Sequence, residues 1–123
     1  MSPDSRESKG RMDRTTRARL EARARVFKAL AHPSRLCIVS ELAAGERCVC
    51  ELARLIGADV STASRHLALL RAAGLVADEK RGLQVFYTLR VCCIPEFLEC
   101  VESVLRTTRE ERRPARRAVG RRG

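Results

Sequence analysis

Aromatic residues are scarce in this chain of 123 residues, which has no Trp, one Tyr and three Phe. A hydrophobic core must therefore be built from Leu, Val, Ile and Ala, a composition that favours helices over a β-sandwich. No apolar run approaches the roughly 18 residues that cross a bilayer. The N-terminal segment also lacks the apolar core of an export signal. We therefore expect a cytoplasmic protein with one small domain and no membrane contact.

The formal net charge of +10 is unevenly distributed along the chain. Residues 109–123 contain seven Arg and two Glu, and we expect them to form a disordered, Arg-rich tail. Residues 1–14 are polar and are predicted to be a flexible N-terminus. The domain between them, residues 15–108, carries 14 basic and 10 acidic side chains. A basic surface attracts polyanions such as DNA, although charge alone does not distinguish DNA binding from simple solvation.

Apolar residues recur at helical spacing in several parts of the chain. Pro33 and Pro95 fall in predicted first turns, where proline is tolerated. Gly57 ends a short helix, and Asp59 or Ser61 can cap the helix that follows. The predicted helices span about residues 15–31, 33–45, 49–56, 61–73 and 94–106.

The apolar period changes from 3.6 to 2 after the fourth helix. Two short apolar runs flank "EKRG", where Gly82 supports a turn, and this pattern predicts a β-hairpin. One face of the hairpin is expected to hold Leu83, Val85, Tyr87 and Leu89. Two helices joined by the tight turn "GADVS" indicate a helix-turn-helix, and the hairpin adds a wing. The predicted fold class is therefore mainly α with a β-hairpin wing, in the order α-α-α-α-β-β-α.

The fourth helix has an apolar face and a polar face. On a helical wheel Leu67 and Leu70 lie within about 40° of Ala63, so this side is expected to pack inward. The predicted DNA-contacting residues are Ser61, Ser64 and Arg65 on the opposite face, Thr62 and His66 at its border, and Lys80, Arg81 and Gln84 in the hairpin. Small hydrogen-bonding side chains and one Arg suit groove entry and contacts to phosphates and base edges. An ordinary solvent-facing helix has similar residues, but the turn before it and the hairpin after it favour double-stranded DNA.

Two long segments carry a family resemblance. "VFKALAHPSRLCIVSEL" and "CVCELARLIGADVSTASRHLALLRAAGLVADEKRGLQVFYTL" resemble the ArsR/SmtB family of bacterial metal-responsive repressors, over about residues 20–105. The resemblance implies a homodimeric winged-helix repressor that leaves its operator when an inducer binds. It also implies a dimer interface formed by the first and last helices, in agreement with their apolar stripes.

Six cysteines remain to be explained. A cytosolic location argues against a disulfide framework, which leaves metal binding, redox chemistry or packing. "CVC" resembles the arsenic-sensing branch, which implies that Cys48 and Cys50 bind As(III) or Sb(III) as inducer. The motif of that branch continues to a third cysteine, where this chain has Ala53.

The third thiol must come from elsewhere, and we expect Cys93, or with less support Cys92 or Cys100. Residues i and i+2 lie about 200° apart on a helix, so both thiols can face one ion only if the helix start is unwound. Either Cys48 lies at or before the N-cap, or ligation distorts the helix next to the DNA-contacting helix. Cys37 is predicted to be a core residue.

Other functions remain open. The same fold can sense Cd or Pb or thiol oxidation, and it can serve as an architectural DNA-binding protein without a sensor. A nitrogen and oxygen zinc site is disfavoured because the chain contains only His32 and His66. A thiol enzyme is disfavoured because the cysteine spacing is CxC without a surrounding βαβ pattern. We therefore expect no enzymatic activity.

Overall fold

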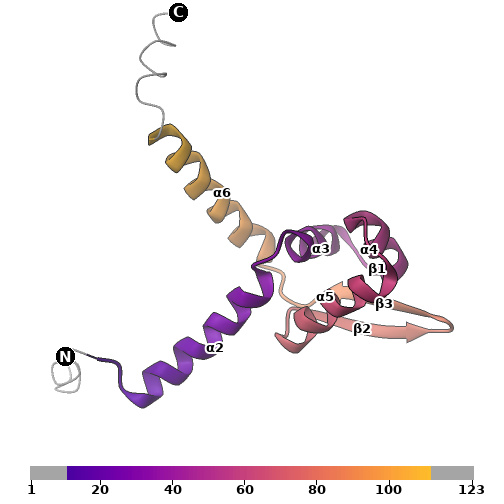
Figure 1. Cartoon of the computed structure of the whole chain (residues 1–123), viewed down its shortest axis with the longest axis horizontal. Coiled ribbons are helices and arrows are strands. Elements are labelled where there is room, and N and C mark those ends of the chain that lie inside the picture. Colours follow the sequence, from indigo (N-terminus) through magenta and orange to yellow (C-terminus); the bar gives the residue numbers. More distant parts are fainter. Residues whose placement is uncertain (1–10, 112–123) are drawn as a thin grey trace, which may run out of the picture. The chain divides into compact units, whose positions relative to one another are not determined.

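The chain has the predicted helix-turn-helix with a wing in its computed structural model, which describes residues 11–111 (Figure 1). One unit, up to Arg90, contains α2 (Arg14–Leu30), α3 (Pro33–Ala44), β1 (Arg47–Cys48), α4 (Val49–Ile56), α5 (Val60–Ala72), β2 (Val76–Arg81) and β3 (Gln84–Leu89). A second unit, from Val91, contains α6 (Ile94–Glu111). The predicted fold class is confirmed, since four helices precede the hairpin and one follows it.

Short-range chemistry sets the ends of the helices. The imidazole Nδ1 of His32 accepts the Ser34 N–H at 3.0 Å, and Pro33 occupies the first turn of α3. Helix α4 ends at Gly57, whose φ of 69° is left-handed and therefore favours glycine. The Asp59 carboxylate then caps α5. The resulting turn between α4 and α5 is short because each helix ends or begins with its own local signal.

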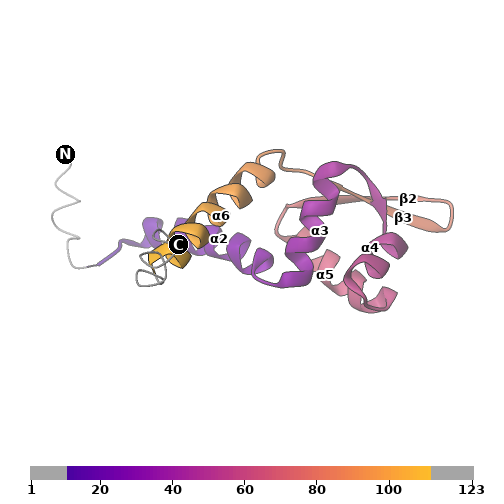
Figure 2. The same ribbon diagram turned by 90° about the horizontal axis from the view of Figure 1, so that it is seen from above.

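The sheet has a third strand that the alternation of apolar residues did not predict. Strand β1 pairs antiparallel with β3, which gives the order β1-β3-β2. Two residues are too few for a period-2 pattern to be visible in the sequence. Figures 1 and 2 both show the hairpin of β2 and β3 extending past α4 as a wing.

The predicted hairpin face is wrong at one position. Arg81 pairs with Gln84, so Gly82 and Leu83 form a two-residue turn. Gly82 has a φ of 62°, and a glycine at the first turn position is typical of type II′ hairpins. Leu83 is therefore in the turn and 99% exposed, rather than on a strand face. Glycine, not the apolar residue after it, determines where the strand ends.

The core lies where α3, α4 and α5 meet the sheet. Its fully or almost fully buried side chains are Ile38, Val39, Leu42, Leu52, Ala63, Leu67, Leu70, Leu75 and Val76. The inward face of α5 is the predicted one. Cys37, predicted to be a core residue, is exposed in the chain. Its neighbours Ile38 and Val39 point into the core, which turns Cys37 to the opposite side of α3.

The outer helices differ from the predicted boundaries by a few residues. Helix α2 begins after Asp13, whose carboxylate accepts the Thr16 N–H at 2.7 Å. Helix α6 continues to Glu111, so residues 109–111 of the predicted disordered tail are helical. The predicted flexible residues 1–10 and the tail from 112 onward lie outside the described residues. Within residues 11–111, the helices are too short or too polar to cross a membrane.

The buried face of α5 provides a stability test. We expect Leu67→Ala to lower the free energy of unfolding by about 2–5 kcal/mol, because Leu67 is fully buried and truncation leaves a cavity. Urea unfolding at fixed protein concentration measures the change. Leu83→Ala is the matched control and should stay within about 0.5 kcal/mol of the original chain. Equal effects at the two positions would contradict the assignment of the core.

Candidate nucleic-acid interface and thiol pair

The N-terminus of α5 is held by side chains of its own first turn. The Asp59 carboxylate accepts the Thr62 N–H at 2.8 Å and the Ser61 hydroxyl at 3.3 Å. The Thr62 N–H holds the pKa of Asp59 below its usual range. This cap keeps the first turn of α5 formed. In a helix-turn-helix, the N-terminal residues of this second helix are the ones that contact DNA in the major groove.

The outward face of α5 is polar and open. Ser61, Ser64 and Arg65 are exposed, whereas Thr62 is half-buried. The Arg65 guanidinium donates to the Thr62 hydroxyl at 3.3 Å, which is a weak contact that DNA can replace. Together these residues form a small surface of hydrogen-bond donors and acceptors with one fixed positive charge.

His66 lies at the border of the outward face, as predicted, and it contacts α3. Its Nδ1 lies 3.1 Å from Nη1 of Arg35, and its ring centroid lies 4.5 Å from that of His32. Arg35 also donates through Nε to the Ala29 carbonyl at 2.6 Å. His66 is half-buried, and its contact with Arg35 joins α5 to α3. Burial is the main cause of its lowered pKa, followed by the nearby His32, Arg35 and Arg65.

The predicted wing residues Lys80, Arg81 and Gln84 are all exposed. Lys80 and Gln84 flank the turn. Arg81 is engaged inside the chain, because its guanidinium donates to the carboxylates of Glu46 and Glu79. It also lies 4.7 Å from the centroid of the Phe86 ring. The positive charge of Arg81 is therefore already paired with two carboxylates of the same chain.

Cys48 is the N-cap of α4, and its side chain is buried. Its backbone is extended, with a φ of −84° and a ψ of 163°. Cys48 therefore lies outside the regular helix, and the helical angle between residues i and i+2 does not apply to Cys48 and Cys50. The Glu51 carboxylate accepts the Cys48 N–H at 3.0 Å, and this contact is the main cause of the lowered pKa of Glu51. The predicted position of Cys48 at the helix start is thus confirmed.

The remaining thiols are exposed. Cys50 lies in the first turn of α4, and Cys37 lies on α3. In the second unit Cys92 and Cys93 precede α6, where the Cys93 carbonyl accepts the Phe97 N–H at 3.1 Å, and Cys100 lies within the helix.

Soft thiolates at the start of α4 suit a thiophilic metalloid in donor type. Cys48 and Cys50 supply two such donors from one turn of chain. Among the described residues of either unit, however, no three His, Cys, Asp or Glu side chains are grouped as a metal site. The first unit thus provides a pair of thiols and leaves a third donor to be found.

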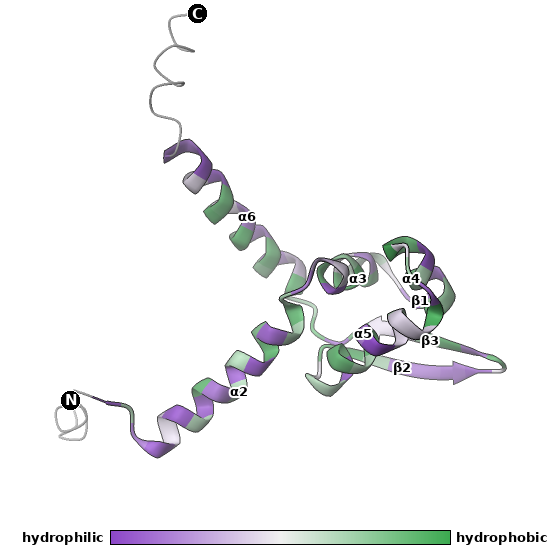
Figure 3. Ribbon diagram, viewed as in Figure 1, coloured by the Kyte–Doolittle hydropathy of each residue, from purple (hydrophilic) through white to green (hydrophobic). Residues whose placement is uncertain are grey.

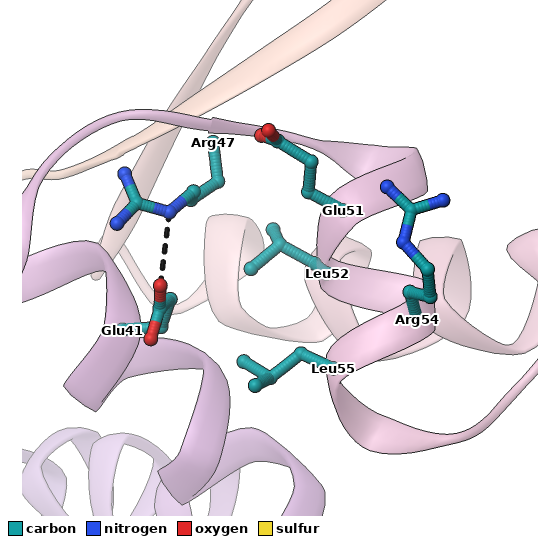
Figure 4. Close-up of a pocket in the computed structure, with 6 residues that line it drawn as sticks. All are labelled: Glu41, Arg47, Glu51, Leu52, Arg54 and Leu55. Carbon is teal, nitrogen blue, oxygen red and sulfur yellow. Dashed lines mark hydrogen bonds and ion pairs between the residues drawn. The ribbon is translucent and has the colours of Figure 1, made fainter.

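An open pocket of about 320 Å³ lies beside β1, between α3 and α4 (Figure 4). An ion pair at its wall joins Nε of Arg47 to the Glu41 carboxylate at 2.9 Å. Glu51, Leu52, Arg54 and Leu55 complete the lining. The ion pair holds β1 to α3, next to Cys48.

This winged helix-turn-helix is similar to known proteins in sequence and in structure. Residues 32–78 match the model of the family described as "Bacterial regulatory protein, arsR family". The biofilm growth-associated repressor of Xylella fastidiosa is 38% identical over 89 residues, which are 72% of this chain and 76% of that protein. The chain belongs to the arsR family. This confirms the predicted family and, because the family is one of regulatory proteins, the prediction that the chain is not an enzyme.

Two further proteins are similar to this chain, one in sequence and one in structure. The arsenical resistance operon repressor of Escherichia coli K12 is 49% identical over 67 residues, which are 52% of this chain and 56% of that protein. This chain therefore spans about half the length of that curated relative. A solution structure from Mycobacterium bovis superimposes with a TM-score of 0.68 at 35% identity, over 83% of this chain and 94% of that one. That structure is of the homodimeric winged helix-turn-helix DNA-binding domain of a possible ArsR-family transcriptional regulator.

Three residues at this arsR-family site escaped the sequence analysis. Glu46 precedes the unpredicted strand β1 and Arg47 begins it, and Arg35 lies 31 positions from His66, so no local pattern indicated their contacts.

The environment of His66 predicts a pH dependence. Its pKa is lowered in the folded chain, so the neutral form is favoured. The unfolded chain therefore takes up the proton first as the pH falls below about 6.5. The contribution of His66 to the free energy of unfolding is therefore fully present above this pH. It is lost as the pH falls toward the lower pKa of His66 in the folded state.

The dependence can be measured by urea unfolding between pH 7.5 and 5. We expect the free energy of unfolding to fall over this range and His66→Gln to flatten the fall. A Ser64→Ala variant controls for substitution on the same helix. An unchanged slope in His66→Gln would show that His66 is not the group responsible.

Proposed function

We propose that this protein is a transcriptional repressor that binds operator DNA as a homodimer and acts in the cytoplasm. The observation that carries this proposal is the division of α5 into two faces. Ala63, Leu67 and Leu70 are fully buried, and this packing leaves Ser64 and Arg65 exposed on the other side. In a winged helix-turn-helix this face enters the major groove while the wing contacts the backbone or the minor groove.

Apolar side chains on both outer helices support the dimer. Leu20 and Phe27 of α2 are 41% and 55% exposed, and on α6 Val101 and Val104 are 40% and 61% exposed. Figure 3 shows hydrophobic residues recurring along α6. Exposed apolar patches of this kind mark interaction sites. In our proposal α2 and α6 bury these residues against a second copy, and a two-fold dimer suits a palindromic operator.

The proposed inducer is As(III) or Sb(III), bound by the thiolates of Cys48 and Cys50. Cys93 is the proposed third donor, and Cys92 and Cys100 are its alternatives. A trivalent metalloid would join thiolates that are separate in the free protein. These cysteines of the chain would hold the ion. Helix α4, whose N-cap is Cys48, packs against α5. A few kcal/mol of coupling between the two sites is enough to change DNA affinity by orders of magnitude.

Cd(II), Pb(II) or thiol oxidation is the second candidate input. The exposure of Cys50, Cys92 and Cys93 favours oxidation as an alternative, since accessible thiols react readily. These inputs use the same thiols, so comparison of inducers on cysteine variants separates them.

Arg65 tests the proposed DNA contact. We expect Arg65→Ala to weaken operator binding about 5- to 150-fold, which corresponds to about 1–3 kcal/mol for a lost base or phosphate contact. Fluorescence anisotropy with operator DNA at fixed salt measures the affinity. Arg23→Ala removes the same charge from α2 and should have a much smaller effect. Equal loss in both variants would indicate only non-specific charge attraction.

The cysteine pair tests the proposed inducer. We expect arsenite to release DNA from the original chain in reducing buffer, and Cys48→Ser/Cys50→Ser to bind DNA normally without release. Cys37→Ser is the matched control and should respond like the original chain. Parallel titrations with antimonite, cadmium, zinc and peroxide rank the inputs. Full release by arsenite from the double variant would move the site to Cys92, Cys93 and Cys100.

A further inference from the structure

Two elements of the first unit meet at strand β1. In the antiparallel register, Cys48 lies opposite Phe86 and Arg47 lies opposite Tyr87 of the wing strand β3. Cys48 is also the residue from which α4 begins. The backbone that carries one thiol of the proposed inducer pair is therefore part of the same sheet as the wing.

A second connection lies two residues earlier. Arg81, at the end of β2, donates through Nη1 to Oε1 of Glu46 at 3.0 Å, and its Nη2 contacts the other oxygen of the same carboxylate. Such a two-point contact is more directional than a single hydrogen bond. The residues are 35 positions apart, so the pair joins the outer end of the wing to the segment before Cys48.

The environment of Arg81 suits a structural contact. Its guanidinium also donates to Glu79 at 2.9 Å and lies over the ring of Phe86, the residue opposite Cys48. The side chains of Arg81 and Glu46 retain 46% and 35% exposure, so this surface pair contributes little to global stability. Its consequence is geometric, because it fixes the direction of the wing relative to the cysteine segment.

We propose that Arg81 is a positioning residue, which through Glu46 connects the wing to the cysteine segment and transmits thiol ligation at Cys48 to the DNA-binding wing. This rests on the proposed function. Cys48 is buried, and two side-chain contacts hold the residues directly before it, the Glu46–Arg81 pair and the Arg47–Glu41 pair. A ligand that draws Cys48 toward Cys50 shifts β1, and both the Phe86 register and the Glu46 carboxylate shift with it.

The proposal differs from a direct role of Arg81 in DNA binding. If the Arg81 guanidinium contacts a DNA phosphate, removal of an internal carboxylate should strengthen DNA binding. Removal of Glu46 or of Glu79 should then have the same effect. A positioning residue instead depends on the particular carboxylate that leads to Cys48. Glu46 and Glu79 both contact Arg81, but only Glu46 lies on the cysteine segment. The chain thus provides its own matched control.

The first experiment measures the response to inducer. The ratio of operator affinity without and with arsenite is compared in the original dimer, Glu46→Gln and Glu79→Gln, with arsenite binding followed separately by isothermal titration calorimetry. We expect Glu46→Gln to reduce the ratio at least 5-fold while arsenite binding persists, and Glu79→Gln to leave the ratio within about 2-fold. Equal ratios in the two variants would overturn the proposal.

The second measurement does not depend on an inducer. Coupling is reciprocal, so loosening the wing should expose Cys48. We expect Glu46→Gln and Arg81→Gln to accelerate maleimide labelling of Cys48, resolved by mass spectrometry, by a similar factor, with no further gain in the double variant. Glu79→Gln and the labelling rate of Cys37 are the controls. Unchanged labelling of Cys48 would overturn the connection.

The two measurements separate the two proposals. If the original chain shows no release by arsenite, the proposed inducer fails, and the labelling of Cys48 still decides whether Glu46 and Arg81 connect the wing to this segment. If the original chain releases DNA but Glu46→Gln responds normally, the inducer proposal stands and the connection fails.

Discussion

The burial of one face of α5 is the constraint on which the rest of the structure depends. Leu67 and Leu70 are fully buried among α3, α4 and the sheet, so α5 cannot rotate without losing apolar burial. This packing determines which side chains are left for DNA, namely Ser64 and Arg65. Helix α4, whose N-cap is Cys48, packs against the proposed recognition helix in the same core.

Polar contacts refine what the apolar core leaves undecided. His66 and Arg81 both have the residue types expected of DNA contacts, yet each is engaged within the chain, by Arg35 and by Glu46 respectively. The contact with Arg35 joins His66 of α5 to α3, and the contact with Glu46 joins Arg81 of the wing to the residue before β1. Charge and exposure alone do not separate a residue that contacts a ligand from one that positions its neighbours.

Membership of the arsR family and the geometry of Cys48 answer different questions. The family explains the winged helix and suggests a regulator, but it does not select an inducer. The backbone of Cys48 is extended at the N-cap of α4, so this residue lies outside the regular helix that contains Cys50. The first unit still provides only a pair, since Ala53 stands where a third thiol of the motif would lie. In our proposal the third donor is Cys93, with Cys92 and Cys100 as its alternatives.

Local signals in the sequence determined most of the fold and part of the site. Apolar periodicity, the caps at His32 and Asp59, and the breaks at Gly57 and Gly82 were sufficient for the helices, the hairpin and the open face of α5, because each depends on residues a few positions apart. Only the tertiary structure decided strand β1, the partners of His66 and Arg81, and the exposure of Cys37. These features depend on contacts between residues 31 to 40 positions apart, or on which side of a helix faces the core, and no local period encodes them.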